Sequence, residues 1–182
     1  MVDNSSAFNK VALRVAVRYG LIGGAVACVA IVVLFLMGRH PFLLPVVFDF
    51  RIILYSVMVI FALREIRDFH LGKMLFFFQG MVASNLVVWL AAVIGALFVW
   101  ILAANHPTFI SEYVAVMTEQ MTANRDLLTK NVGEEAYRQQ MAKLPATSAW
   151  ALAGDYFLKS IIIGLFLTII ISVVMRRQPK TM

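Results

Sequence analysis

The stretch FALREIRDFHLGKMLFFFQG, residues Phe61–Gly80, decides how this chain folds. It leaves one long apolar run, passes through a short charged segment and enters a second apolar run. The charged segment consists of Arg64, Glu65, Arg67, Asp68, His70 and Lys73. Charged residues between two hydrophobic runs are typical of a short loop that joins two membrane helices. We call residues 61–80 the hinge.

The composition points to lipid as the main solvent of this protein. Of its 182 residues, 62% are hydrophobic and 14% are charged, and the mean hydropathy is +0.85. A soluble domain is typically about 45–50% apolar and about 25% charged. Because so few charges cannot cover a surface in water, we expect a lipid bilayer around the chain. The net charge of +6 is interpreted below as a topology signal, so no nucleic-acid partner is expected.

The apolar runs predict an all-α membrane protein, with four transmembrane helices in an up-down bundle. The expected spans cover about residues 11–38, 45–64, 74–104 and 155–175, and residues 1–182 form a single membrane domain. The uncharged run from Tyr19 to Met37 extends about 28 Å as a helix, close to the ~30 Å hydrocarbon core. Asp49 and Arg51 lie in the first turns of the second span. They either snorkel to the interface or pair with another helix.

Residues 105–150 form the one long polar segment, which we expect to be helical. Apolar residues recur at helical spacing in its first half, at Ile110, Tyr113, Met117, Met121 and Leu128. Ser111 is the expected N-cap of this first helix, and a second helix is expected over residues 134–144. Thr147 or Ser148 is the expected cap of the last helix. Both segment helices are amphipathic, and they pack on each other, lie on the membrane surface or meet a partner.

The distribution of charge predicts the orientation of the chain. The N-terminus, the hinge and the C-terminus together carry nine of the 16 Lys and Arg residues but only three of the ten Asp and Glu residues. The other loops carry seven of each, so the whole positive excess lies on one side. Since basic residues near span ends mark the cytoplasmic side, we predict N-in, C-in threading in the inner (cytoplasmic) membrane. Residues 105–150 are then extracytoplasmic.

Three polar residues of the third span are the candidate intramembrane site: Gln79, Ser84 and Asn85. Polar side chains in hydrocarbon usually face other helices and form hydrogen bonds there. The functional interpretation is the lining of a substrate path, and the structural one is adhesion between helices. Asn85 lies deepest and is the residue to test first.

Small residues suggest faces at which helices approach closely. Gly20 and Gly24 form a GxxxG pair in the first span, and Gly95 follows Ala91 at the same spacing in the third. This pattern leaves open whether the contacts form within the bundle or between copies of the chain.

The basic residues at the predicted cytoplasmic rim are a candidate head-group site: Arg14, Arg18, Arg64 and Arg67. Such a cluster anchors the topology or, alternatively, holds an anionic lipid or a polyprenyl phosphate.

The sequence contains none of the familiar metal-binding or catalytic motifs. His40 and His106 fall on the same predicted face, but no HExxH or paired-Cys spacing supports a metal site. No Gly-rich phosphate loop, GxSxG elbow or CxxC motif occurs. We therefore predict no catalytic, metal or cofactor residues.

The chain resembles the DUF4199 family of small bacterial membrane proteins. The hinge carries the resemblance in Arg64, Arg67, Asp68, Gly72 and the FFFQG stretch at 76–80. The YGLIGG stretch at 19–24 and the charged segment before a last span that ends in basic residues agree with it. The resemblance implies a membrane protein of unassigned activity and supplies no catalytic residue. It also implies an association with polyprenyl-phosphate glycosyltransferases.

These observations favour a non-enzymatic accessory or structural subunit of a membrane assembly. The alternative is a small transport component, or a partner in a lipid-linked pathway, that uses the polar residues of the third span and the basic rim. The expected partners are the lipid bilayer, other membrane proteins or an anionic lipid.

Overall fold

The computed structural model describes the backbone of residues 2–43 and 49–177, and the side chains of residues 8–43 and 49–177. This part of the chain is helical, apart from turns and one isolated β-bridge. The elements are α1 (Val2–Leu36), α2 (Phe50–Glu65), the π-helical turn η2 (Ile66–His70), α3 (Phe77–Asn105), α4 (Pro107–Ala123), α5 (Arg125–Val132), α6 (Glu134–Lys143), the 3₁₀ turn η3 (Leu144–Ala146) and α7 (Ala149–Met175).

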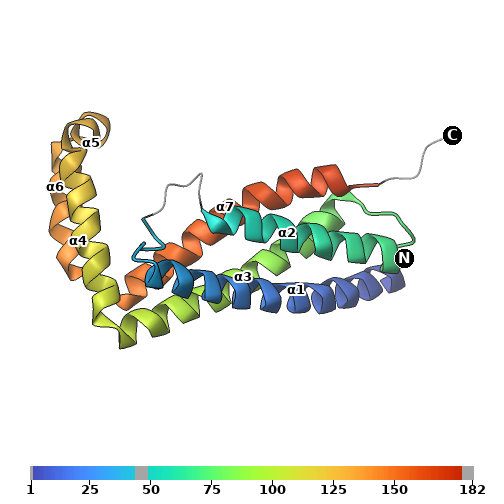
Figure 1. Ribbon diagram of the computed structural model, residues 1–182. Coiled ribbons are helices and arrows are strands. Elements are labelled where there is room, and N and C mark those ends of the chain that lie inside the picture. The colour runs from blue at the N-terminus through green and yellow to red at the C-terminus, as the bar shows by residue number, and fades with distance from the viewer. Residues whose placement is uncertain (1, 44–48, 178–182) are drawn as a thin grey trace.

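Four helices, α1, α2, α3 and α7, form an elongated bundle in which successive helices run in opposite directions (Figure 1). Helix α3 is the central element, since it packs extensively against both α1 and α7. The N-terminus, the connection between α2 and α3, and the end of α7 gather at one end of the bundle, which we call the terminal end. The loop after α1 and the helices α4–α6 gather at the opposite end, which we call the arm end.

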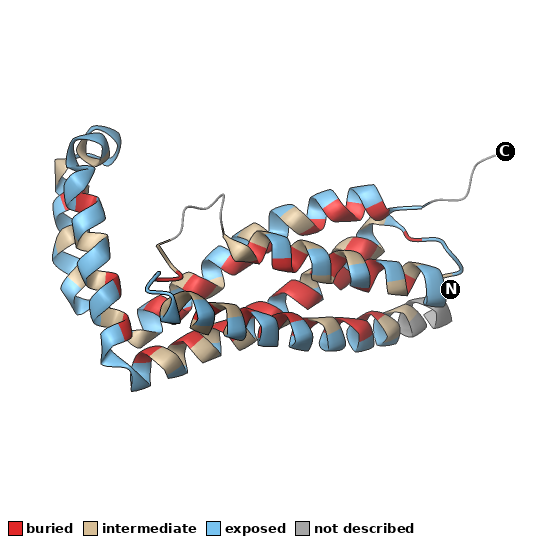
Figure 2. Cartoon of the chain, in the orientation of Figure 1, coloured by how far each residue is buried: buried red, intermediate tan, exposed pale blue. Residues whose placement is uncertain are grey.

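Three of these helices are long and apolar enough to cross a membrane. They cover Phe8–Leu36, Phe77–Asn105 and Ala149–Met175. At about 1.5 Å per residue, each is longer than the ~30 Å hydrocarbon core. Many of their large apolar side chains are exposed, as expected for helices in contact with lipid. Figure 2 shows exposed residues along the outward sides of these helices. The chain therefore has the properties of a membrane protein with several apolar helices.

Helix α2 is shorter, with 16 residues, and it begins at Phe50. The helical backbone continues into η2, whose five residues bring the continuous helical segment to His70. The charged part of the hinge was expected to be a loop, but its first residues extend a helix. The predicted start of this span, residues 45–48, lies outside the described residues.

The buried core has two parts along the bundle. Toward the terminal end, α1, α2, α3 and α7 enclose a cluster that includes Val59, Leu63 and Val87. Toward the arm end, α1, α3 and α7 meet the base of α4 at Phe109 and Tyr113. Figure 2 shows the buried residues on the facing sides of the bundle helices, whereas most of α4–α6 is exposed.

Helices α4–α6 form an arm that projects from the bundle at a steep angle (Figure 1). The two predicted helical regions of this segment are present, with a break at Asn124 that divides the first into α4 and α5. The expected cap at Ser111 is wrong, because α4 begins at Pro107 and Ser111 lies inside it, donating to the carbonyl of Thr108. Proline is favoured in the first turn of a helix, because an N–H at that position has no acceptor within the helix and its loss costs no hydrogen bond.

The cap of the last helix is Ser148. Its Oγ accepts a hydrogen bond from the backbone N–H of Ala151 at 3.2 Å. Helix α7 therefore begins several residues before Asp155, the position at which the sequence predicts the span to start. Asp155 forms an ion pair with Lys159 one turn later, at 2.7 Å.

Candidate functional site

A buried charged cluster lies inside the bundle near the arm end. Asp49 caps α2, and its Oδ1 accepts from the backbone N–H of Arg51 at 3.0 Å. The side chain of Arg51 turns back on the same carboxylate, and its Nε lies 2.8 Å from Oδ1 and 3.0 Å from Oδ2. Only 4% of Arg51 is exposed. The sequence left two possibilities, snorkelling or pairing with another helix. Arg51 is buried and so does not snorkel, and its ion pair is with Asp49 at the start of its own helix.

Arg51 also joins α2 to α7. Its Nη1 donates to the carbonyl oxygen of Tyr156 and to Oγ of Ser160, both at 3.1 Å. The guanidinium carbon lies 4.9 Å from the centre of the Tyr156 ring, within the range of a cation–π contact. The charge of Arg51 is thus balanced by a carboxylate, a carbonyl, a hydroxyl and an aromatic face. Since every nitrogen of this group bonds to the protein, the arrangement is that of a clamp between two helices.

Two tyrosine hydroxyls complete this cluster. Tyr55 and Tyr156 are each 1% exposed, and neither hydroxyl has a hydrogen-bond partner among the described residues. The ring of Tyr156 occupies the space beside Gly95 of α3, where an added Cβ would lie 2.5 Å from the tyrosine oxygen. Gly95 is therefore required by the side chain that holds Arg51.

His40 lies in a second buried cluster, in the loop after α1. It packs against the rings of Phe42, Phe109 and Tyr113. Its Nε2 donates to the carbonyl oxygen of Phe109 at 3.1 Å, and its Nδ1 accepts from the N–H of Phe42. Burial lowers the pKa of His40 to about 4, against the opposing effect of the Phe109 carbonyl. A neutral His40 thus fastens the base of the arm to the end of α1.

The two histidines considered for a metal site have different environments. Both ring nitrogens of His40 are engaged with the protein. His106 is exposed and precedes the first residue of α4. The described residues contain no group of three His, Cys, Asp or Glu side chains with metal-binding geometry.

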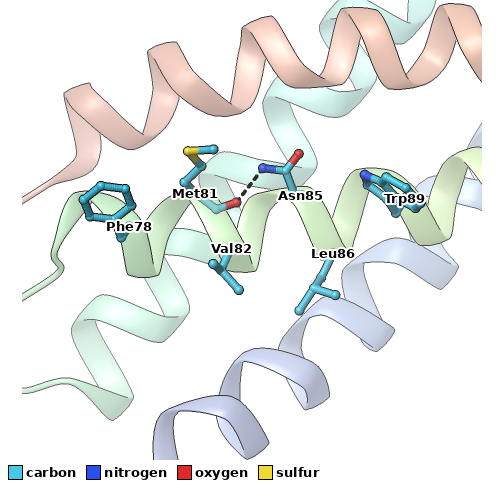
Figure 3. A pocket seen from close by; sticks show the side chains of 6 residues that line it. All are labelled: Phe78, Met81, Val82, Asn85, Leu86 and Trp89. Atoms are coloured by element: carbon cyan, nitrogen blue, oxygen red, sulfur yellow. Dashed lines mark hydrogen bonds between the residues drawn. The ribbon is translucent and has the colours of Figure 1, made fainter. Parts of the chain in front are cut away.

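The three predicted intramembrane polar residues each bond to their own helix. Gln79 accepts from the N–H of Phe76 at 3.3 Å and so stabilises the first turn of α3. Ser84 is fully buried and donates to the carbonyl of Gly80 at 2.7 Å. Asn85 donates to the carbonyl of Met81 at 2.8 Å, the bond drawn in Figure 3.

Asn85 borders a shallow groove of about 370 Å³. All six residues that line the groove come from α3, as Figure 3 shows: Phe78, Met81, Val82, Asn85, Leu86 and Trp89. Phe78, Val82 and Trp89 are exposed, so this is an outward face of the bundle. The position of Asn85 is therefore at the lipid-facing surface, away from the axis of the bundle.

The candidate head-group residues are only partly free. Arg18 forms an ion pair with Glu65, which also accepts from the hydroxyl of Tyr19 at 3.0 Å. Arg67 pairs with Asp68 at 2.7 Å and holds the pKa of that carboxyl below its usual value. Arg14 and Arg64 are exposed and form no ion pair among the described residues. The ion pair of Arg18 connects α1 to the end of α2, which places the two halves of the predicted rim side by side.

The candidate packing glycines contact other helices of the same chain. A Cβ added to Gly20 would lie 2.8 Å from Leu90, and one added to Gly24 would lie 2.8 Å from Ile94. Both neighbours are on α3. The GxxxG face of α1 thus contacts α3 of the same chain. Gly95 of α3 in turn contacts Tyr156 of α7.

A family model described as a protein of unknown function, DUF4199, matches residues 18–177. The chain belongs to the DUF4199 family. The match covers the whole hinge and reaches the basic residues after α7, so the resemblance predicted from the sequence is confirmed. Searches of curated proteins and of solved structures found no match.

Sequence reasoning missed several residues of the central cluster in this DUF4199 protein: Tyr55, Tyr156 and Ser160. An available signal was the four-residue spacing of Tyr156, Ser160 and Gly164 in an otherwise apolar run, which puts them on one helix face. A charged residue inside an apolar segment, such as Arg51, also demands polar partners on a neighbouring helix. Which helix supplies them depends on the packing of the bundle, and the sequence does not encode this locally.

Proposed function

We propose that this DUF4199 protein is a multi-pass protein of the bacterial inner membrane, with four spans and both termini in the cytoplasm. Three apolar helices support three spans. Helix α2 would be the fourth, because α2 and η2 together form a continuous helical segment from Phe50 to His70. The positive excess at the terminal end supports the orientation, since basic residues stay on the cytoplasmic side. The arm is then extracytoplasmic.

Within that membrane, we assign the protein the role of a non-enzymatic accessory subunit that contacts a partner protein through the arm. The observation that supports this role is the arm itself, which projects beyond the bundle (Figure 1). Glu134 links α5 to α6 by accepting from Arg125 at 3.0 Å and from Arg138 at 3.1 Å. Tyr137 and Met121 are buried between the arm helices. These contacts hold α5 against α6 and support the arm as a contact element.

The arm offers apolar surface that its own helices leave uncovered. Leu127 and Val132 on α5 are 64% and 50% exposed, and they lie at the far end of the arm from the bundle. Leu127 also lines a groove of about 350 Å³ between α4, α5 and α6, together with Met117, Met121 and Leu128. Flexible methionine side chains suit surfaces that adapt to a partner.

A transport component receives less support from the geometry. A path for a polar solute needs polar groups directed into a common space. Gln79, Ser84 and Asn85 instead bond within α3, and the guanidinium of Arg51 is bonded to Asp49, Tyr156 and Ser160. A partner role in a lipid-linked pathway is compatible with the accessory role, because the basic residues of the terminal end remain available.

Site-specific photo-crosslinking in intact cells tests the accessory role. A photoreactive amino acid at Leu127 is expected to give a discrete adduct with one other protein. The same group at Phe166, a 64% exposed position on the lipid-facing side of α7, serves as the matched control. In addition, Leu127→Asp with Val132→Asp is expected to abolish co-purification of that partner in mild detergent, with the membrane level of the chain unchanged. A monomer with no bound protein, and no adduct from Leu127, would exclude this role.

A further inference from the structure

A pocket of about 310 Å³ lies at the terminal end, between the start of α1, the hinge and the start of α3. Its apolar lining comes from Phe8 and Val11 of α1 and from Met74 and Phe76 of the hinge. Polar groups at its border come from His70 and Gln79. We call it the hinge pocket. Since α3 begins at Phe77, the pocket is level with the end of an apolar helix, where lipid head groups and acyl chains meet.

Backbone hydrogen bonds hold the hinge around this pocket in one conformation. The N–H of Lys73 donates to the carbonyl of Arg67 at 2.9 Å, and that of Met74 donates to Leu71 at 3.1 Å. Leu75 and Arg177 form an antiparallel bridge with bonds of 3.0 and 2.9 Å. This bridge ties the residue between Met74 and Phe76 to the chain that follows α7. The pocket is therefore preformed and needs little ordering upon binding.

Lys73 has an unusual backbone conformation beside the pocket. Its φ is +67°, and it follows Gly72 at +57°. A non-glycine residue in this left-handed region carries backbone strain of order 1 kcal/mol or more, and such strain tends to occur at functional positions. Lys73 is exposed and immediately precedes the pocket residue Met74 in this tight turn.

Three cations lie next to residues of the hinge pocket or of the adjoining bridge. Lys10 precedes the pocket residue Val11, and Arg177 is bonded through its backbone to Leu75. Together with Lys73, both are exposed and form no ion pair among the described residues. The carboxylates described at this end are already engaged, Glu65 by Arg18 and Asp68 by Arg67. The charge of these cations is thus available to an anion from outside the chain.

From these observations we propose that the hinge pocket binds an anionic glycerophospholipid of the leaflet at the terminal end. One acyl chain lies against Phe8, Met74 and Phe76. The phosphate accepts from Lys73, and from the amide nitrogen of Gln79, which has no protein partner in the described part of the chain. A cation near the surface favours an anionic lipid about five-fold. The lipid then supports the turn that joins the second and third bundle helices.

Native mass spectrometry of the full chain in mild detergent tests this site. Phosphatidylglycerol and phosphatidylcholine with identical acyl chains are titrated separately. We expect phosphatidylglycerol to bind at least about five-fold more tightly. Lys73→Asn is expected to reduce that preference several-fold, because asparagine tolerates the left-handed turn but carries no charge. Lys73→Arg keeps the charge and is expected to retain the preference.

The matched control is Lys130→Asn, which removes an exposed lysine from α5 in the arm and is expected to bind as the unaltered chain does. Equal affinity for the two lipids would overturn the proposal, as would an unchanged preference in the Lys73→Asn variant. A preference for polyprenyl phosphate over phosphatidylglycerol would overturn it in favour of a lipid-linked substrate. None of these outcomes depends on a partner protein, so the accessory role is tested separately.

Discussion

At the scale of single residues, the bundle is defined by a few polar side chains in apolar surroundings. An ionised group removed from water is destabilising by several kcal/mol unless it is paired and hydrogen-bonded. Arg51 satisfies this condition with Asp49 on its own helix and with Tyr156 and Ser160 on α7. The same contacts fix the rotation of α7 relative to α2, because only one face of α7 presents these groups. The clamp thus specifies the packing as well as stabilising it.

Replacing Arg51 by Met is expected to destabilise the bundle by about 3 kcal/mol, because Asp49 would keep a partly buried charge without its partner. Adding Asp49→Asn removes that charge and is expected to recover more than half of the loss. Unfolding by sodium dodecyl sulfate in mixed micelles, followed by circular dichroism, measures both effects. A double variant less stable than the single one would contradict a role for the ion pair.

His40 makes the attachment of the arm sensitive to acid. Its pKa in the folded protein is about 4, below the ordinary value of 6.5, so the unfolded chain binds a proton first as the pH falls. The contribution of neutral His40 to the free energy of unfolding is therefore complete above pH 6.5 and is lost progressively as the pH falls toward 4. We expect a loss of roughly 1–3 kcal/mol in unfolding free energy between pH 7.5 and 4.5.

The matched comparison for His40 is His40→Gln, whose amide can donate to the carbonyl of Phe109 but does not titrate. Unfolding free energies of both proteins at the two pH values give the part that belongs to His40. The glutamine variant is expected to show the smaller loss. An equal loss in both would assign the acid sensitivity to carboxylates elsewhere in the chain.

At the scale of the elements, α3 and α7 pack through a four-residue repeat. The buried face of α7 carries Tyr156, Ser160, Gly164, Thr168 and Ser172. Gly95 of α3 meets Tyr156, Val88 meets Gly164 and Gly80 meets Ser172, in antiparallel register. Small residues at this spacing let the two backbones approach closely, which favours packing where lipid offers no hydrophobic driving force.

Gly164→Ala tests this register. The added Cβ would lie 2.2 Å from a methyl group of Val88, so we expect destabilisation by about 1–3 kcal/mol. Val88→Ala removes that methyl group, and the double variant is expected to show a favourable coupling of about 1 kcal/mol. Gly154→Ala is the matched control on α7, since no atom lies within 4 Å of its added Cβ. It should leave unfolding in mixed micelles nearly unchanged or slightly raise the stability.

The sequence predicts these elements better than it predicts their contacts. Long apolar runs and the charged hinge locate the apolar helices because a helix satisfies its backbone hydrogen bonds within a single run of residues, as hydrocarbon requires. The break at Gly133 and the cap at Ser148 depend on local residue types, so they can be predicted from the sequence. The partners of Arg51 and the burial of His40 cannot be predicted in this way, since they depend on which helix faces meet. The same limit applies to Asn85, whose depth along α3 was predicted but whose outward direction was not.

At the scale of the whole molecule, the two ends of the bundle differ in chemistry. The terminal end combines the N-terminus, the hinge and the end of α7, and it carries cations without acidic partners in the described chain. The arm end carries the projecting helices, in which Glu134 is paired with both Arg125 and Arg138. A membrane separates two such ends readily, because basic segments resist translocation whereas balanced ones do not.

The proposed orientation predicts which end a membrane-impermeant maleimide can reach in intact cells. With Cys28, the single cysteine, replaced by Ser, one new cysteine is placed at Asn131 on the arm or at Phe69 in the hinge. Both positions are exposed in the structure, Phe69 by 82%, so protection by the fold does not decide the result. We expect strong labelling at position 131, and labelling at position 69 only after permeabilisation. The reverse pattern would invert the orientation, and labelling of both in intact cells would place the hinge and the arm on the same side. That outcome would mean that α3, the long helix between the two positions, does not cross the membrane.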